Sequence, residues 1–136
     1  MPLGRTSLTR LGTCHDLLQT LVRRVSARLD AAGLDCAVLC GHRTQAEQDA
    51  AVASGASRLR WPRSKHNRSP AHAVDLAPYV RGRVSWDWPD YHRMAVHVRA
   101  VWAEMVDEGL TTGWRLVWGG DWSTLKDGPH WELQDD

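Results

Sequence analysis

The chain has 136 residues and a formal net charge of +1, with 17 basic and 16 acidic side chains. This length suits a single domain, 1–136, with its own hydrophobic core, and the near-neutral charge argues against nucleic acid or an anionic membrane as the main partner. No apolar run approaches the roughly 20 residues that a membrane-spanning helix needs. The first ten residues lack the apolar centre of a secretory signal.

Three helices are predicted along the chain. The first and the third have apolar residues at steps of three and four, which is the helical period. Thr13 is the expected N-cap of the first, and Thr44 with Glu47 forms a capping box at the start of the second. The predicted helices are 13–31, 45–53 and 89–109.

Short apolar runs predict the strands, and a long segment without periodicity, 55–72, is expected to be an ordered loop. Loops of that length inside compact domains are usually functional. Helices and strands are mixed without regular βαβ alternation, so the expected fold is α+β, with a small, mainly antiparallel sheet and flanking helices. The predicted strands are 35–40, 73–77 (closed by Pro78), 84–86, 116–118 and 130–133.

Three cysteines, Cys14, Cys36 and Cys40, exclude a full disulfide framework because their number is odd. In an extended strand, Cys36 and Cys40 would be roughly 13 Å apart, too far for a disulfide or a shared metal. We expect all three to be buried thiols that behave as small hydrophobic side chains.

Two segments carry side chains suited to a metal site. Residues 64–79 supply His66 from a polar loop and Asp75 from an apolar run, and 126–133 supply His130. Two neutral imidazoles and one carboxylate are a ligand set of catalytic zinc, which keeps one position open for water. Such a zinc lowers the pKa of its water to about 7 and polarises a substrate carbonyl. His72 is the alternative histidine, because it lies in the same loop as His66.

Hydrolysis also needs a general base. Asp127, separated from His130 by a Gly-Pro pair, is the first candidate, and Glu132 is the alternative. An aspartate before Gly-Pro is also typical of a plain turn. Arg43 follows a predicted buried strand, where its guanidinium could hold a substrate carboxylate bidentately or simply lie in solvent.

These residues lie in motifs that resemble the zinc peptidases of bacterial cell-wall peptides. That family includes phage endolysin L-alanyl-D-glutamate endopeptidases, D-alanyl-D-alanine carboxypeptidases and the vancomycin-resistance D,D-dipeptidases. The matching motifs occur in family order and span most of residues 11–134. They are Gly-His-Arg-Thr with Gln-Ala-Glu-Gln, Ser-Lys-His with Ala-Val-Asp-Leu-Ala-Pro-Tyr, Trp-Gly-Gly-Asp-Trp, and Asp-Gly-Pro-His-Trp-Glu-Leu.

The resemblance implies a hedgehog-type, D-Ala-D-Ala-peptidase-like fold and assigns a role to each motif. The implied Zn²⁺ ligands are His66, Asp75 and His130, the implied catalytic acid and base is Asp127, and the implied substrate-binding residues are Arg43 and Ser64. Many members place the aspartate seven residues after the first histidine, whereas here the spacing is nine.

An aspartate at position 127 and the Trp-Gly-Gly-Asp-Trp motif most resemble the endolysin branch. The implied reaction is hydrolysis of the peptidoglycan stem peptide at the L-Ala–D-Glu bond by zinc-activated water, in a monomer without membrane insertion. Without a signal segment, such an enzyme stays in the host cytoplasm until a separate hole-forming protein releases it to the cell wall. The alternatives are a D-alanyl-D-alanine carboxypeptidase or dipeptidase, and a non-catalytic zinc domain that binds a cell-wall or protein ligand.

Overall fold

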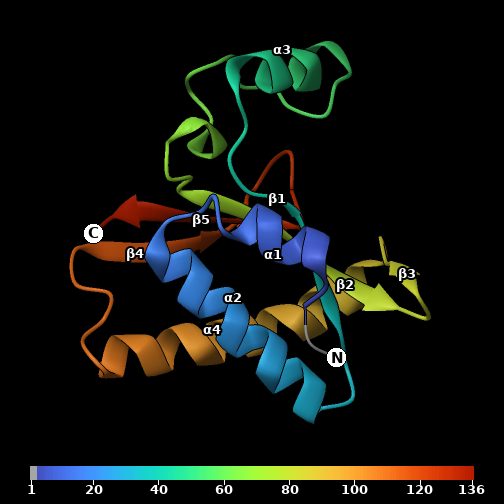
Figure 1. Ribbon diagram of the computed structural model, residues 1–136, viewed down its shortest axis with the longest axis vertical. Coiled ribbons are helices and arrows are strands. Elements are labelled where there is room, and N and C mark those ends of the chain that lie inside the picture. The colour runs from blue at the N-terminus through green and yellow to red at the C-terminus, as the bar shows by residue number, and fades with distance from the viewer. Residues whose placement is uncertain (1–2) are drawn as a thin grey trace.

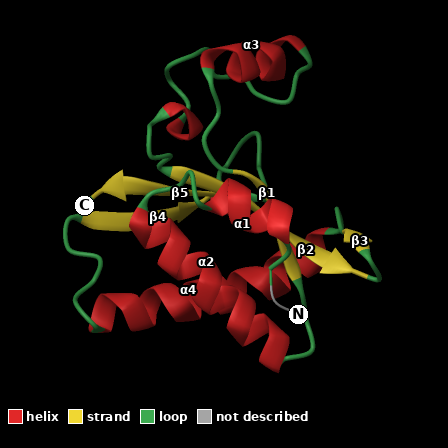
Figure 2. Cartoon of the chain, viewed as in Figure 1, coloured by secondary structure: helices red, strands yellow, loops and turns green. Residues whose placement is uncertain are grey.

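The computed structural model describes residues 3–136, and Met1 and Pro2 lie outside the described residues. It confirms the α+β prediction, with helices packed on a small antiparallel sheet (Figure 1, Figure 2). The helices are α1 (Arg5–Leu11), α2 (Asp16–Ala31), α3 (Gln45–Ala53) and α4 (Trp88–Asp107), with two 3₁₀ turns, η1 (Lys65–Asn67) and η2 (Gly119–Asp121). The strands are β1 (Cys36–Cys40), β2 (Ala73–Val80), β3 (Arg83–Val84), β4 (Trp114–Trp118) and β5 (His130–Asp135).

The sheet has the strand order β1-β2-β5-β4, and β3 pairs with the end of β2. Every pairing is antiparallel. The two central strands are β2 and β5, and their register places Asp75 directly opposite His130. Directly opposed residues in an antiparallel pair have neighbouring side chains on the same face. The register therefore brings two predicted site residues together from distant parts of the chain.

One face of the sheet is covered by α2 and α4, which cross each other beside it (Figure 1). Because side chains alternate along a strand, Val74 and Leu76 are buried in this core while Asp75 points to the opposite face. The same alternation buries Leu133 in the core and leaves His130 and Glu132 on the face of Asp75. The core also takes apolar side chains from both helices, including Leu18, Leu21, Val25, Met94, Val98 and Met105.

The predicted start of the helix 13–31 is wrong. In the structure α1 ends at Leu11, the chain breaks the helical path, and α2 begins only at Asp16. An isolated bridge between Cys14 and Ala71 keeps the chain extended there. The N-cap of α2 is therefore His15, whose Nδ1 accepts from the Leu17 N–H (3.1 Å), and not Thr13. The unpredicted α1 packs against β1 and protects that edge of the sheet.

Several strand boundaries also differ from the prediction; β5, for example, ends at Asp135 and not at residue 133. Pro78 does not close β2, since the N–H of Tyr79 donates to the Asp35 carbonyl (2.9 Å) and pairing continues past the proline. Of the predicted strand 84–86, only Val84 belongs to β3. The β4 strand begins two residues before the predicted 116–118. By contrast, the capping box at the start of α3 is confirmed. None of the helices within residues 3–136 has the length and apolar composition needed to cross a bilayer.

Candidate active site

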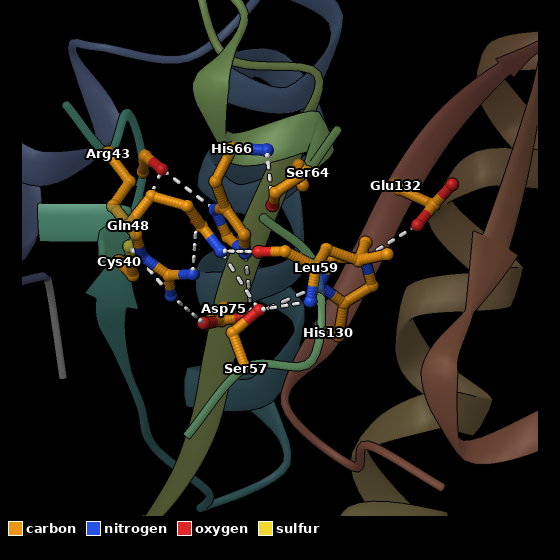
Figure 3. Close-up of polar contacts among 12 residues, drawn as sticks. Cys40, Arg43, Gln48, Ser57, Leu59, Ser64, His66, Asp75, His130 and Glu132 are labelled. Carbon is orange, nitrogen blue, oxygen red and sulfur yellow. Dashed lines mark hydrogen bonds and ion pairs between the residues drawn. The ribbon is translucent and has the colours of Figure 1, made fainter. Parts of the chain in front are cut away.

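Asp75 is the centre of the candidate site. Its Oδ1 lies 3.2 Å from His66 Nε2 and 3.4 Å from His130 Nδ1 (Figure 3). Both histidines are buried, and the Asp75 side chain is 17% exposed. Two imidazole nitrogens from different elements thus face one carboxylate oxygen, which is a donor set that suits Zn²⁺. The nine-residue spacing does not separate His66 from Asp75.

Donor atoms close enough to share one cation form two groups among residues 3–136, and both contain Asp75. One group adds Cys40 and His66, and the other adds Asp127 and His130, with all donor atoms in a group within 4.8 Å of one another. The predicted ligands His66 and His130 fall in different groups, and Asp75 is the member that the two groups share. The residues present fit a divalent cation bound at this carboxylate.

His66 is positioned by the short turn η1. The Ser64 hydroxyl accepts from the His66 backbone N–H (3.2 Å), and the Asn67 side-chain oxygen accepts from the Ser64 N–H (3.1 Å). The imidazole Nδ1 lies 2.8 Å from the Gly41 carbonyl, which can only accept. Nδ1 therefore carries a proton, and Nε2 faces Asp75, where it could bind a metal once its own proton has left.

His130 is oriented in the complementary way by Glu132. The His130 Nε2 lies 2.7 Å from Glu132 Oε1, on the far side of the ring from Asp75 (Figure 3). Gln134 donates to the other oxygen of the same carboxylate (3.0 Å). Nε2 therefore carries a proton, and Nδ1 faces Asp75 on the other side of the ring. This contact makes Glu132 a positioning residue and does not support its alternative assignment as the general base.

The charges of the cluster are strongly coupled. Burial alone would lower the pKa of His66 and of His130, but the Asp75 carboxylate raises the pKa of each above its ordinary value. Burial would raise the pKa of Asp75, but His66 and His130 hold it well below its usual range. The metal-free cluster is thus an ion-paired network, and a cation that binds there displaces protons from the imidazoles.

Asp127 is placed beside this cluster by the segment between η2 and β5. Its backbone N–H donates to the Gly119 carbonyl (3.0 Å), and its own carbonyl accepts from the His130 N–H (3.3 Å). Gly119 is required at this contact, because a Cβ there would collide with the Asp127 carbonyl. Burial and the charge of Asp75 raise the pKa of Asp127, as expected for a carboxylate that works as a base near neutral pH.

Arg43 is half-buried and does not project into solvent. Its Nη2 lies 3.9 Å from Asp75 Oδ2, and its Nη1 donates to Gln48 Oε1 (3.0 Å). The backbone N–H of Arg43 donates to the His66 carbonyl (2.8 Å), which ties the start of α3 to the loop that carries His66. The guanidinium is therefore fixed at the edge of the cluster, where it can meet an anionic ligand.

A cleft of about 920 Å³ opens over these side chains. Its walls also include the apolar side chains of Leu59, Trp86, Trp122 and Leu125. A volume of this size holds a small peptide segment. The cleft contains every residue that the sequence assigned to the site, which are Arg43, Ser64, His66, Asp75, Asp127 and His130.

Two other sequence-based expectations have different outcomes. His72, the alternative ligand, is not among the cleft-lining residues. Its ring instead packs edge-on against the rings of His15 and Trp114, with distances between ring centroids of 5.6 Å and 5.2 Å. Cys14 and Cys36 are buried, and burial raises the pKa of both thiols to about 12. The expectation is wrong for Cys40, which is only half-buried and has its Sγ 3.7 Å from Arg43 Nη2.

Replacement of Glu132 by alanine should weaken metal binding. Loss of the partner that orients a metal-binding histidine typically lowers affinity by about 10–100-fold. Glu132→Gln, which keeps a hydrogen-bond acceptor but not the charge, should have a smaller effect. Competition with a chromophoric chelator measures both values, with the exposed Glu104→Gln as control. Equal affinity in Glu132→Ala and wild type would show that this contact has no role in metal binding.

Comparison with known proteins identifies relatives that are named as L-alanyl-D-glutamate peptidases. The sequence model of the phage L-alanyl-D-glutamate peptidase family matches residues 1–134. The L-alanyl-D-glutamate peptidase of Escherichia phage T5 is 30% identical over 127 residues, covering 91% of this chain and 83% of the relative. The peptidoglycan L-alanyl-D-glutamate endopeptidase CwlK of Bacillus subtilis is 30% identical over 128 residues, covering 85% of this chain and 73% of CwlK.

A solved structure extends this similarity to the fold. The crystal structure of the L-Ala D-Glu endopeptidase ChiX from Serratia marcescens superposes with a TM-score of 0.72 at 35% sequence identity. The match covers 98% of this chain and 90% of the ChiX chain. The strands and loops that position the candidate site therefore lie within the region shared with that structure.

Proposed function

Because the chain belongs to the phage L-alanyl-D-glutamate peptidase family, we propose that it is a zinc-dependent peptidase that cuts the L-Ala–D-Glu bond of the peptidoglycan stem. The named relatives support peptidase action on peptidoglycan. We propose in addition the metal, the roles of the residues and the bond that this chain cuts. The observation that carries it is the meeting of Asp75 with His66 and His130 in one cleft, with Asp127 beside them.

In this proposal the zinc ligands are His66 Nε2, an Asp75 carboxylate oxygen and His130 Nδ1. When bound, zinc supplies a Lewis acid for the substrate carbonyl and lowers the pKa of a coordinated water. The protein contributes the orientation of the donors, since Gly41 and Glu132 hold the outer nitrogens of the two rings. This orientation keeps the donor nitrogens turned to Asp75 before any cation arrives.

Asp127 is the proposed general base and then the general acid. Its carboxylate lies close to Asp75 and His130 but is not part of the pairs that hold the imidazoles. It can take a proton from the attacking water and return it to the leaving amine. The raised pKa of Asp127 favours both transfers.

Arg43 and Ser64 are the proposed substrate-binding residues. The Arg43 guanidinium keeps N–H groups that can donate to a substrate carboxylate, such as the free carboxylate of the stem glutamate. The Ser64 hydroxyl oxygen accepts from the His66 N–H, so its own hydrogen is left for a substrate carbonyl. One chain supplies every residue used, so a monomer is sufficient. A phage enzyme of this kind would need a separate hole-forming protein to reach the cell wall.

The substrate bond is tested with a purified stem peptide and mass spectrometry of the products. The proposal predicts release of the L-alanine side of the peptide and a new amino terminus on D-glutamate. Release of the terminal D-alanine instead would make the chain a D-alanyl-D-alanine carboxypeptidase or dipeptidase. No cleavage of peptide or peptidoglycan by zinc-loaded protein would favour the non-catalytic binding domain. A purely structural zinc, however, prefers a closed shell of four protein ligands.

A further inference from the structure

The α3 helix and the segment after it are held to the rest of the molecule in an unusual way. In Figure 1, α3 stands apart from the sheet and from the other helices. No side chain between Gly41 and Pro70, all of which are described, belongs to the hydrophobic core or packs against it. Gln48 is the only buried residue in the described stretch 44–63, with none of its surface exposed. Apolar packing therefore does not explain the position of this segment.

The Gln48 side-chain amide makes four hydrogen bonds to three parts of the chain (Figure 3). Its Oε1 accepts from Arg43 Nη1 (3.0 Å) and from Asn67 Nδ2 (3.2 Å). Its Nε2 donates to Ser57 Oγ (2.9 Å) and to the Leu59 carbonyl (2.6 Å). An amide has two donor hydrogens and one oxygen with two lone pairs, so its capacity is filled.

Each of these partners is connected to the cleft. Arg43, Ser57 and Leu59 line it directly, and Asn67 follows the proposed ligand His66 in the η1 turn. Asn67 Nδ2 also lies 3.1 Å from the Arg43 carbonyl, which closes the network around the arginine. One buried amide thus links the proposed substrate arginine, the loop of the first proposed metal ligand and the wall formed by 57–59.

From this network we infer that Gln48 is a positioning residue for substrate binding. It fixes the direction of the Arg43 guanidinium and the distance between the 57–59 wall and the Asp75 cluster. Its own atoms are buried and need not touch the substrate. The inference rests on the proposed function, because it assumes that Arg43 holds the acidic stem peptide.

Gln48→Met tests the inference, since methionine has a similar length but cannot replace the amide. The substitution removes the hydrogen bonds that orient the Arg43 guanidinium and hold the Leu59 carbonyl. We expect KM for a stem peptide to rise by about 10–100-fold, because a misoriented guanidinium binds the substrate less well. The value of kcat should change much less, because Asp127 and the metal ligands do not contact Gln48. Zinc content should stay close to wild type, because Gln48 does not contact the proposed metal ligands. The melting temperature should fall, because the buried partners of the lost amide are left unsatisfied. Gln45→Met, on the exposed face of the same helix, should behave as wild type.

A double-mutant cycle with Arg43→Ala separates positioning from a general structural role. If Gln48 acts through Arg43, Gln48→Met should add little to the KM of the Arg43→Ala protein. Full additivity of the two effects would overturn the role through Arg43 and leave only the contacts to Ser57 and Leu59. A wild-type KM in Gln48→Met would overturn the inference as a whole. If Gln48→Met does not fold, Ser57→Ala removes one of the four contacts and should raise KM a few-fold. A wild-type KM in that variant would again overturn it.

The failure of this inference can be distinguished from that of the proposed function. Wild-type protein that cuts the L-Ala–D-Glu bond, together with a Gln48→Met variant of unchanged KM, removes only the positioning role. Zinc-loaded wild-type protein that does not cut the stem peptide removes both.

Discussion

Asp127→Asn should lower kcat for stem-peptide cleavage by about 10²–10⁴-fold, the usual contribution of a positioned general base. Asparagine has the same shape but cannot take the proton of the attacking water. The variant should still bind zinc, because Asp127 is not among the proposed ligands and does not orient either imidazole. Turnover of a defined peptide and the zinc content of the same sample together measure the effect.

Asp121→Asn is a matched control, because Asp121 lies in the same part of the chain but is exposed and paired with Arg99. It should keep the wild-type rate. If Asp127→Asn retained most of its activity, the assignment of Asp127 as the base would be wrong. If it lost zinc together with activity, Asp127 would belong among the ligands, as its closeness to Asp75 and His130 allows.

Asp75→Asn should abolish metal binding and reduce activity at least as strongly as Asp127→Asn. Within residues 3–136, Asp75 is the only residue that forms an ion pair with both His66 and His130. A neutral amide is a poor zinc ligand, and the two imidazoles alone leave the cation with too few donors. Equilibrium dialysis against zinc and peptide turnover should therefore both report loss.

The same substitution should destabilise the metal-free protein in a pH-dependent way. The pKa of Asp75 is lowered on folding and the pKa values of His66 and His130 are raised. The Asp75 carboxylate contributes folding stability that is fully present above its ordinary pKa of 3.8. This stability is lost as the pH falls through the lower pKa that Asp75 has in the folded protein. The two imidazoles contribute folding stability that is fully present below their ordinary pKa of 6.5. This stability is lost as the pH rises through their pKa values in the folded protein, about 10 for His66 and about 9 for His130.

The stability difference between wild type and Asp75→Asn should therefore be largest between pH 3.8 and 6.5. In this pH range we expect the free energies of unfolding of the two proteins to differ by on the order of 2 kcal/mol, the usual contribution of a hydrogen bond to a charged group. Urea unfolding of the metal-free proteins at pH 5 and above pH 10 measures it. A difference that did not shrink at the higher pH would contradict the ion-paired network.

Much of the site could be predicted because its residues have local signals. The alternation around Asp75 shows that its side chain leaves the face of Val74 and Leu76, and the structure has that arrangement. The family motifs then name His66 and His130, which lie beside Asp75 in the structure. The capping box of Thr44 and Glu47 is equally local, since both hydrogen bonds lie within one helical turn.

Other features depend on contacts between distant segments. Leu11 and Cys14 are buried and keep the helical spacing of α2, so the break at 12–15 has no local signal. It follows from the bridge between Cys14 and Ala71. A proline normally disfavours continuation of a strand. After Pro78, however, the Tyr79 N–H donates to the Asp35 carbonyl just before β1, so the pairing between the two strands continues. Such errors arise wherever tertiary pairing overrides local preference.

The residues that sequence reasoning missed share this property. Gln48 occupies a helix with mostly exposed neighbours, and only its four partners in the fold show that it is a buried link. Cys40 comes near Asp75 because its strand pairs with β2 at that residue. Glu132 differs from these two, because its signal is local: residues two apart on a strand point the same way, so it shares the face of His130. The sequence named it only as the alternative base, and its hydrogen bond to His130 shows the other role.

The measurement that most directly tests the metal centre is the zinc content of the purified protein, beside His66→Ala and His72→Ala. We expect about one zinc per chain in wild type and in His72→Ala, as a single three-ligand site requires. His66→Ala should contain almost none and should not cleave the stem peptide. Absence of zinc from wild type after zinc is added back, or an undiminished zinc content in His66→Ala, would contradict a zinc site that contains His66.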